Sequence, residues 1–139
     1  MIDVVIQEEE TGCGLATVAM VAGQTYEVVK QRANSLGIFA QDQKLWSDTE
    51  YVRRLLEGYG VRVSQGESPF VSWDRVPDLA LLAIKYHIEE GCPCWHWVLY
   101  VREKSGPVVL DPAAYVPENR RKDFDHMFPK WFIEVTMVA

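Results

Sequence analysis

A polar, acidic segment passes directly into an apolar one in residues 7–23, which read QEEETGCGLATVAMVAG. Glycines on both sides of Cys13 indicate a tight turn or the close approach of another part of the chain. The residues that follow are apolar all round, so we expect a buried helix over 13–22 that ends at Gly23. Cys13 then lies at the N-terminus of that helix, where free backbone N–H groups and the helix dipole favour a thiolate.

Turn and capping signals predict further helices over 26–36, 48–58 and 77–90. Thr25 can cap the first of these, and Ser47 with Glu50 forms a capping box for the second. Pro77 suits the first turn of the third, whose apolar positions fit helical spacing better than strand spacing.

Strand signals dominate the second half of the chain, where we expect strands over 95–102, 107–110 and 131–138, after a short one over 61–64. Residues 95–102 are rich in Trp, Val and Tyr, and the turn at 103–106 makes 107–110 their hairpin partner. The predicted fold class is therefore α+β, with an N-terminal helical layer packed on a C-terminal antiparallel sheet.

Length, charge and cysteine content limit the possible classes of protein. At 139 residues we expect a single domain over 1–139. A net charge of −6 argues against a nucleic-acid partner, and the basic cluster 120–122, which acidic residues follow, reads as a solvated loop. The three cysteines suit reduced thiols rather than a disulfide framework.

Neither a membrane span nor a signal peptide is visible in the sequence. Every apolar stretch is shorter than the roughly 18 residues that a span requires. Residues 1–6 lack the basic start and the cleavage site of a signal peptide. We therefore expect a cytoplasmic protein.

A nucleophilic cysteine needs a base within hydrogen-bond reach and a third group that orients the base. Strand alternation places His96 on one face with Cys94 and Val98. The hairpin brings Asp111, at the end of the next strand, back towards His96, where a carboxylate could hold the imidazole ring. The order of Cys13, His96 and Asp111 along the chain is that of papain-type enzymes.

Gln7 lies six residues before Cys13, on the segment that enters the glycine-flanked turn. Its side-chain amide and the backbone N–H of Cys13 could together form an oxyanion hole. The loss of one such donor typically costs about 3 kcal/mol of transition-state stabilisation.

Cys92, Cys94 and His96, with His87 nearby, raise the alternative of a zinc site. Zinc sites normally use a two-residue gap between cysteines and a second ligand pair elsewhere, and the sequence has neither. We therefore expect no metal and no cofactor, with Cys94 lining the cleft beside His96 or packing under it. His126, in a loop, is the weaker alternative base.

The chain resembles a known family in four motifs, which are Gln7 with Cys13-Gly14, the apolar run 15–23, His96-Trp97-Val98-Leu99, and Val109-Leu110-Asp111-Pro112. They look like those of the bacteriocin-processing cysteine peptidases, papain-like domains that are often fused to peptide-exporting ABC transporters and cleave leader peptides after a double glycine. The resemblance implies a papain-like fold, a peptide or protein substrate, and one role for each of four residues. Cys13 would be the nucleophile, His96 the general base and acid, Asp111 its orienter and Gln7 the oxyanion donor.

Two features depart from the family, and two other functions remain open. Gly12 stands where the family often has an acidic residue, and the chain contains no transporter, so double-glycine specificity does not carry over directly. The same catalytic groups could deamidate glutamine side chains or transfer acyl groups. A catalytically inactive module that binds peptides in the cleft is the second alternative, and it predicts an unreactive Cys13.

Overall fold

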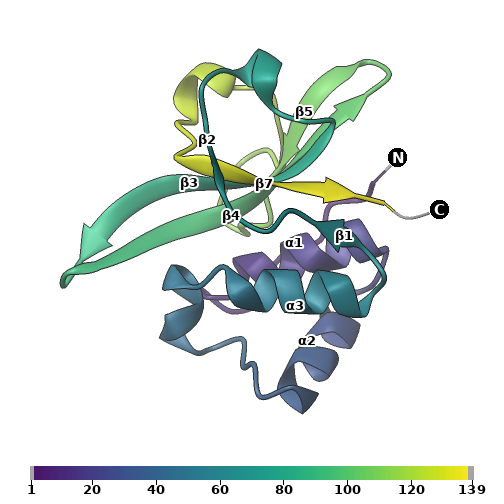
Figure 1. Cartoon of the computed structure of the whole chain (residues 1–139), viewed down its shortest axis with the longest axis vertical. Helices are drawn as coiled ribbons and strands as arrows, with labels where there is room; N and C mark the ends of the chain where they lie inside the picture. The colour runs from purple at the N-terminus through teal and green to yellow at the C-terminus, as the bar shows by residue number, and fades with distance from the viewer. Residues whose placement is uncertain (1, 138–139) are drawn as a thin grey trace.

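The computed structural model describes residues 2–137, in which three α-helices pack against one face of an antiparallel sheet (Figure 1). The α-helices are α1 (Cys13–Ala22), α2 (Tyr26–Ser35) and α3 (Glu50–Gly58). Short 3-10 helices are η1 (Gln43–Ser47), η2 (Trp73–Arg75) and η3 (Phe124–His126). None of the helices in this part of the chain has the length and apolar character needed to cross a bilayer.

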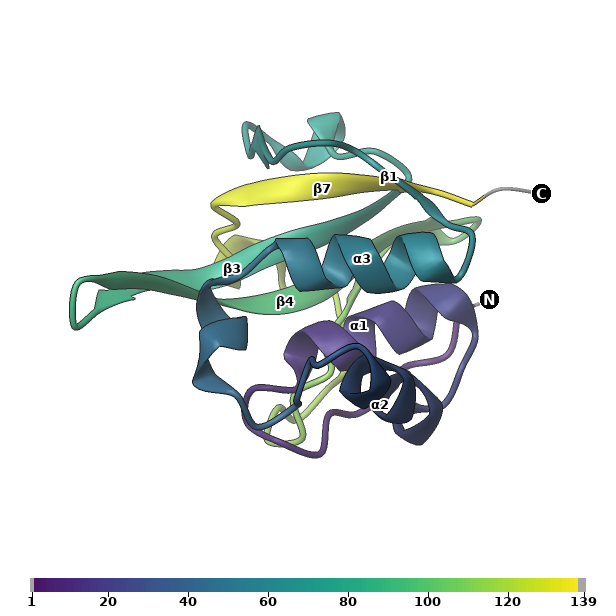
Figure 2. The same cartoon turned by 60° about the horizontal axis from the view of Figure 1, so that its bottom comes forward.

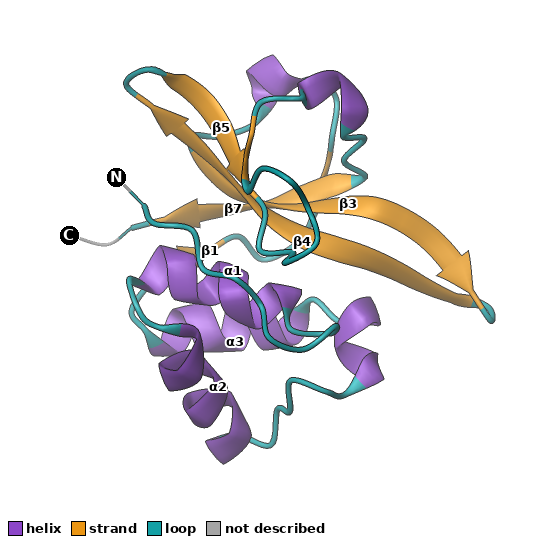
Figure 3. Ribbon diagram, turned by 180° about the vertical axis from the view of Figure 1, so that it is seen from behind, coloured by secondary structure: helices purple, strands orange, loops and turns teal. Residues whose placement is uncertain are grey.

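The strands are β1 (Arg62–Val63), β2 (Ser68–Pro69), β3 (Leu79–Glu89), β4 (Cys92–Glu103), β5 (Gly106–Leu110), β6 (Arg120–Arg121) and β7 (Trp131–Thr136). They pair antiparallel in the order β1-β7-β3-β4-β5-β6, and β2 also pairs with β7. Figure 3 shows the three α-helices together on one side of these strands. The predicted α+β class, with a helical layer on an antiparallel sheet, is confirmed. The last strand was predicted to reach residue 138, which lies outside the described residues.

The helix predicted over 77–90 is wrong, because this segment forms β3 in the middle of the sheet, between β7 and β4. Both faces of its first half are buried. Leu81 and Ala83 face the core under the helices, whereas Leu82 and Ile84 belong to a second apolar cluster on the other face. A strand that is buried on both faces is continuously apolar, so its spacing does not distinguish it from a buried helix.

Helix α1 is the centre of the core, as its sequence predicts. Every residue from Cys13 to Val21 is buried, and the helix contacts β4, α2 and α3 (Figure 2). Gly23 ends the helix with φ +67°, a left-handed conformation that costs glycine little. Cys13 is the first helical residue, so the helix presents its free N–H groups around that side chain.

The capping predictions had different outcomes. Thr25 caps α2, since its hydroxyl accepts a hydrogen bond from the backbone N–H of Val28 at 3.2 Å. The capping box predicted for α3 is wrong. Asp48 accepts the N–H of Glu50 at 2.7 Å, and the Ser47 hydroxyl instead donates to the carbonyl of Pro93 on β4. Ser47 therefore ties η1 to the sheet.

Two hairpins of the sheet position the site. The β4–β5 hairpin is present as predicted, and Leu99 pairs with Leu110 at the last position of β5. Beyond that pair β5 no longer covers the edge of β4. On the other side of β4, the β3–β4 hairpin extends well past the rest of the sheet (Figure 1). A bulge interrupts it between Ile84 and His87.

The glycines around Cys13 allow two tyrosines to approach the backbone closely. A Cβ atom on Gly14 would lie 2.0 Å from the Tyr51 hydroxyl oxygen, and one on Gly12 would lie 2.1 Å from that of Tyr26. Tyr51 is only 4% exposed, so its ring has little room to move away. The Gly12-Cys13-Gly14 sequence is thus required by packing against α2 and α3.

We expect Gly14→Ala to lower the free energy of unfolding by about 1–3 kcal/mol, because the added methyl group overpacks the contact with Tyr51. Helix propensity alone would favour alanine by about 1 kcal/mol. Urea denaturation measures the change. In a Tyr51→Phe background, which removes the nearest atom, the loss should be smaller. A Gly14→Ala variant as stable as the wild type would contradict this account.

Candidate active site

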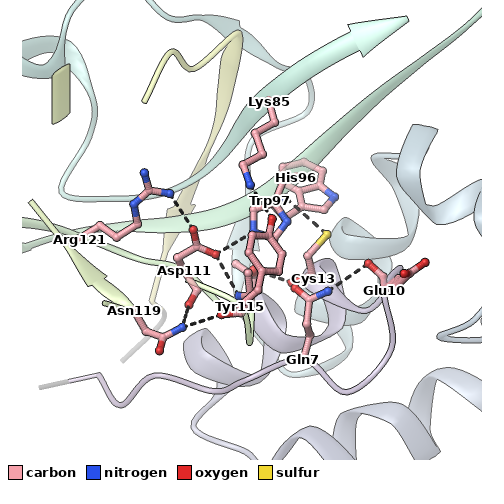
Figure 4. A network of polar contacts seen from close by, with 12 residues as sticks. Gln7, Glu10, Cys13, Lys85, His96, Trp97, Asp111, Tyr115, Asn119 and Arg121 are labelled. Carbon is pink, nitrogen blue, oxygen red and sulfur yellow. Dashed lines mark hydrogen bonds and ion pairs between the residues drawn. The ribbon is translucent and has the colours of Figure 1, made fainter. Parts of the chain in front are cut away.

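Cys13 meets the sheet where β5 leaves the edge of β4 uncovered. Its sulfur accepts a hydrogen bond from the backbone N–H of Trp97, with 3.5 Å between sulfur and nitrogen (Figure 4). Cys13 is 1% exposed. Burial raises the pKa of Tyr51 well above its usual value, and the neighbouring Cys13 raises it further, so Tyr51 remains a neutral phenol beside the sulfur. The Trp97 N–H and the helix N-terminus are the groups beside the sulfur that favour negative charge on it.

His96 lies between Cys13 and Asp111. Its Nε2 donates a hydrogen bond to Oδ1 of Asp111 at 2.8 Å, which leaves Nδ1 of the same ring available to Cys13. Burial lowers the pKa of His96, but the contacts with Asp111 and Cys13 outweigh it and raise the pKa to about 10. At neutral pH the ring is therefore an imidazolium that can pair with a thiolate.

Asp111 is completely buried, yet its carboxylate has a donor at each oxygen. Oδ1 also accepts the backbone N–H of Ala113 at 3.0 Å, and Oδ2 accepts Nη1 of Arg121 at 2.9 Å. Burial raises the pKa of Asp111, whereas hydrogen bonds from His96, Ala113 and Arg121 lower it. The lowering is the larger effect, so the pKa of Asp111 is below its usual value. The carboxylate is thus ionised and fixed in position.

Arg121 and Asn119 hold Asp111 in place, and the sequence analysis did not identify either (Figure 4). Asn119 donates from Nδ2 to the carbonyls of Asp111 and Ala113, at 2.7 and 2.9 Å. Arg121 is itself fixed by a two-pronged pair with Asp123. The prediction that 120–122 is a solvated loop is wrong for Arg121, whose side chain is only 13% exposed. Its role depends on the pairing of β6 with β5, which no local pattern indicates.

Gln7 lies beside Cys13, but its side-chain N–H groups are occupied. Its backbone N–H donates to the carbonyl of Pro112 at 2.9 Å, which ties the N-terminal arm to the chain next to Asp111. The amide Nε2 donates to the carbonyls of Glu9 and Glu10, at 2.9 and 3.0 Å (Figure 4). To serve an oxyanion, Gln7 has to exchange one of these bonds for the substrate oxygen.

A cleft of about 510 Å³ opens over His96. The acidic segment 8–10 and Gln7 line one side of it, and the β3–β4 hairpin lines another. The prediction that Cys94 lines the cleft beside His96 is confirmed. Tyr115 also lines it, with the Lys85 ammonium against its hydroxyl and 4.6 Å from the centre of its ring. His126, the alternative base, lies in η3 and lines a different cavity.

The structure thus brings all four predicted residues, Cys13, His96, Asp111 and Gln7, to one place. In comparisons with known proteins, the sequence model of the peptidase C39 family matches residues 1–138. None of the curated proteins compared matches the chain. The match extends over the arm that carries Gln7, helix α1 and the whole sheet. The chain therefore belongs to the peptidase C39 family, in agreement with its resemblance to the bacteriocin-processing cysteine peptidases.

Proposed function

We propose that this protein hydrolyses a peptide bond with Cys13 as nucleophile, His96 as general base and acid, and Asp111 as the residue that orients His96. The observation that supports this most strongly is the hydrogen bond from His96 to the buried Asp111, made by a ring that also contacts Cys13. An imidazolium between a thiol and an ionised carboxylate is the arrangement that activates a cysteine nucleophile. The family is one of cysteine peptidases, which fits a peptide or protein substrate.

In the proposed reaction the Cys13 thiolate attacks the carbonyl carbon of the scissile bond. The developing oxyanion accepts a hydrogen bond from the Cys13 N–H, which as the first of the helix has no intrahelical acceptor. His96 then protonates the leaving amine. Water attacks the acyl-enzyme, with His96 as base, and the acid product leaves. Asp111 stays ionised throughout and keeps the ring in one orientation.

Gln7 is the second oxyanion donor in this proposal. It is tied to Pro112 through its backbone, so its side chain stays next to Cys13 and His96. Of its two acceptors, the Glu10 carbonyl makes the longer and more exposed hydrogen bond. We expect the substrate oxygen to replace that carbonyl.

Iodoacetamide labelling tests the thiolate–imidazolium pair. Between about pH 8.5 and pH 6, the labelling rate of Cys13 should fall less than that of the exposed Cys92, because Cys13 contacts an imidazolium. His96→Ala should remove this difference, and mass spectrometry of the digested protein assigns each label. Equal labelling of Cys13 in the wild type and in His96→Ala would refute the nucleophile assignment.

Incubation with a mixture of peptides identifies the reaction. A peptidase produces new peptide termini, whereas a deamidase shifts the mass without cleavage and a binding module does neither. Cleavage should disappear in Cys13→Ser and in His96→Ala. If Cys13 is reactive but only deamidation or acyl transfer follows, the triad stands and the peptidase assignment fails.

Substitution of Gln7 tests the oxyanion hole. We expect Gln7→Ala to lower kcat about 10²–10³-fold with a smaller change in KM, since the lost hydrogen bond forms in the transition state. Gln24→Ala, at an exposed position after α1, is the matched control and should change neither constant. If Gln7→Ala lowers only the stability of the protein, Gln7 merely holds the acidic segment.

The charge state of His96 predicts how stability depends on pH. The pKa of His96 is about 10 in the folded chain and near 6.5 when unfolded, so the folded state binds the proton more tightly. This contribution to the free energy of unfolding is complete below about pH 6.5 and is lost as pH rises towards about 10. Urea denaturation across this range should show a decline that is smaller in His96→Gln. Equal slopes in both proteins would contradict the raised pKa.

A further inference from the structure

The projecting part of the β3–β4 hairpin carries metal-ligand side chains on one face. His87 pairs with Cys94 and Glu89 pairs with Cys92 across the two strands. Residues directly opposite each other in an antiparallel pair share a face, as do residues two apart in one strand. His87, Glu89 and Cys94 therefore point to the same side of the hairpin, on the side that bears His96.

The ligand atoms of these three residues already form a compact group. One nitrogen of His87, a carboxylate oxygen of Glu89 and the sulfur of Cys94 all lie within 4.8 Å of one another. Nε2 of His87 is 3.4 Å from Oε2 of Glu89. Ligands around a tetrahedral zinc ion are separated by about 3.5 Å, given bond lengths of about 2.0–2.3 Å. The side chains of His87 and Glu89 are 55% and 63% exposed, so neighbouring residues leave them room to adjust around an ion.

The bulge in β3 orients the histidine ring for this purpose. Lys85, in the bulge, has φ 55°, and its carbonyl oxygen lies 2.8 Å from Nδ1 of His87. A carbonyl oxygen only accepts, so Nδ1 carries the proton of this hydrogen bond, and Nε2 faces the carboxylate of Glu89 and is the nitrogen that a metal ion would bind. Histidines that bind metals almost always donate the other ring N–H in this way.

We propose that His87, Glu89 and Cys94 form a Zn²⁺ site on the wall of the cleft. An imidazole nitrogen, a thiolate and a carboxylate make a ligand set of intermediate softness that suits Zn²⁺ rather than Mg²⁺ or Ca²⁺. Cys94 gives up its thiol proton when it binds, so affinity rises with pH. Three protein ligands leave the fourth position open to water or to a group of the substrate.

The site shares the cleft with the catalytic residues but is separate from them. His87, Glu89, Cys94 and His96 all line the same cavity of about 510 Å³. A zinc ion there would occupy part of the space proposed for the peptide. Its occupancy would thus regulate access to His96, and this consequence alone rests on the proposed function.

Cobalt(II) titration of the reduced, full-length chain tests the site, because Co²⁺ replaces Zn²⁺ and gives a thiolate-to-metal absorption band. We expect one equivalent to produce the band and added Zn²⁺ to remove it. Cys94→Ser should abolish the band, and His87→Ala should weaken Co²⁺ binding by more than about tenfold. Cys92→Ser, two residues along the strand, and Cys13→Ser, which removes the catalytic thiol, should both keep it.

Persistence of the band in Cys94→Ser, or its loss in Cys13→Ser or Cys92→Ser, would overturn the assignment. Absence of any band from the wild type would do so as well. Cys13→Ser is inert in the proposed reaction, so a band in that variant establishes the metal site whether or not the protein is a peptidase. Failure of peptide cleavage in the wild type leaves this readout unaffected.

Discussion

The buried carboxylate of Asp111 is the interaction on which the site depends. A carboxylate with no exposed surface costs several kcal/mol unless charged or polar donors surround it. Here His96, Arg121 and the N–H of Ala113 supply those donors from three segments of the chain. Removal of any one leaves a buried charge partly uncompensated, so the end of β5, the loop after it and β6 are held together by the same group that orients His96.

Local signals were enough to predict the main parts of the fold and the site. The glycine-flanked Cys13 and the apolar run after it specify a buried helix whichever elements surround it. His96 and Asp111 lie on two strands joined by a short turn, so hairpin geometry alone brings them together. β3 was predicted as a helix because it is buried on both faces, and only the finished sheet distinguishes the two readings.

The remaining parts of the site depend on contacts between distant segments. Arg121 reaches Asp111 from a strand of two residues, which is too short to leave a pattern in the sequence. The amide of Gln7 was expected to be free for an oxyanion, but the carbonyls of Glu9 and Glu10 lie within its reach once the acidic segment folds back. Glu89 meets His87 and Cys94 only because residues 79–89 form a strand paired with β4, whereas a helix was predicted there.

The nearly complete burial of Cys13 has a consequence for the selection of substrates. Cys13 is 1% exposed and does not line the cleft over His96, so a peptide reaches its sulfur only in conformations more open than this one. The apparent affinity for a peptide is then its intrinsic affinity multiplied by the populated fraction of such open conformations. A short peptide makes too few contacts to shift that equilibrium, whereas a long one can hold the cleft open along its length. In the proposed enzyme, kcat/KM therefore rises with the length of the peptide even where the residues at the cleaved bond are the same.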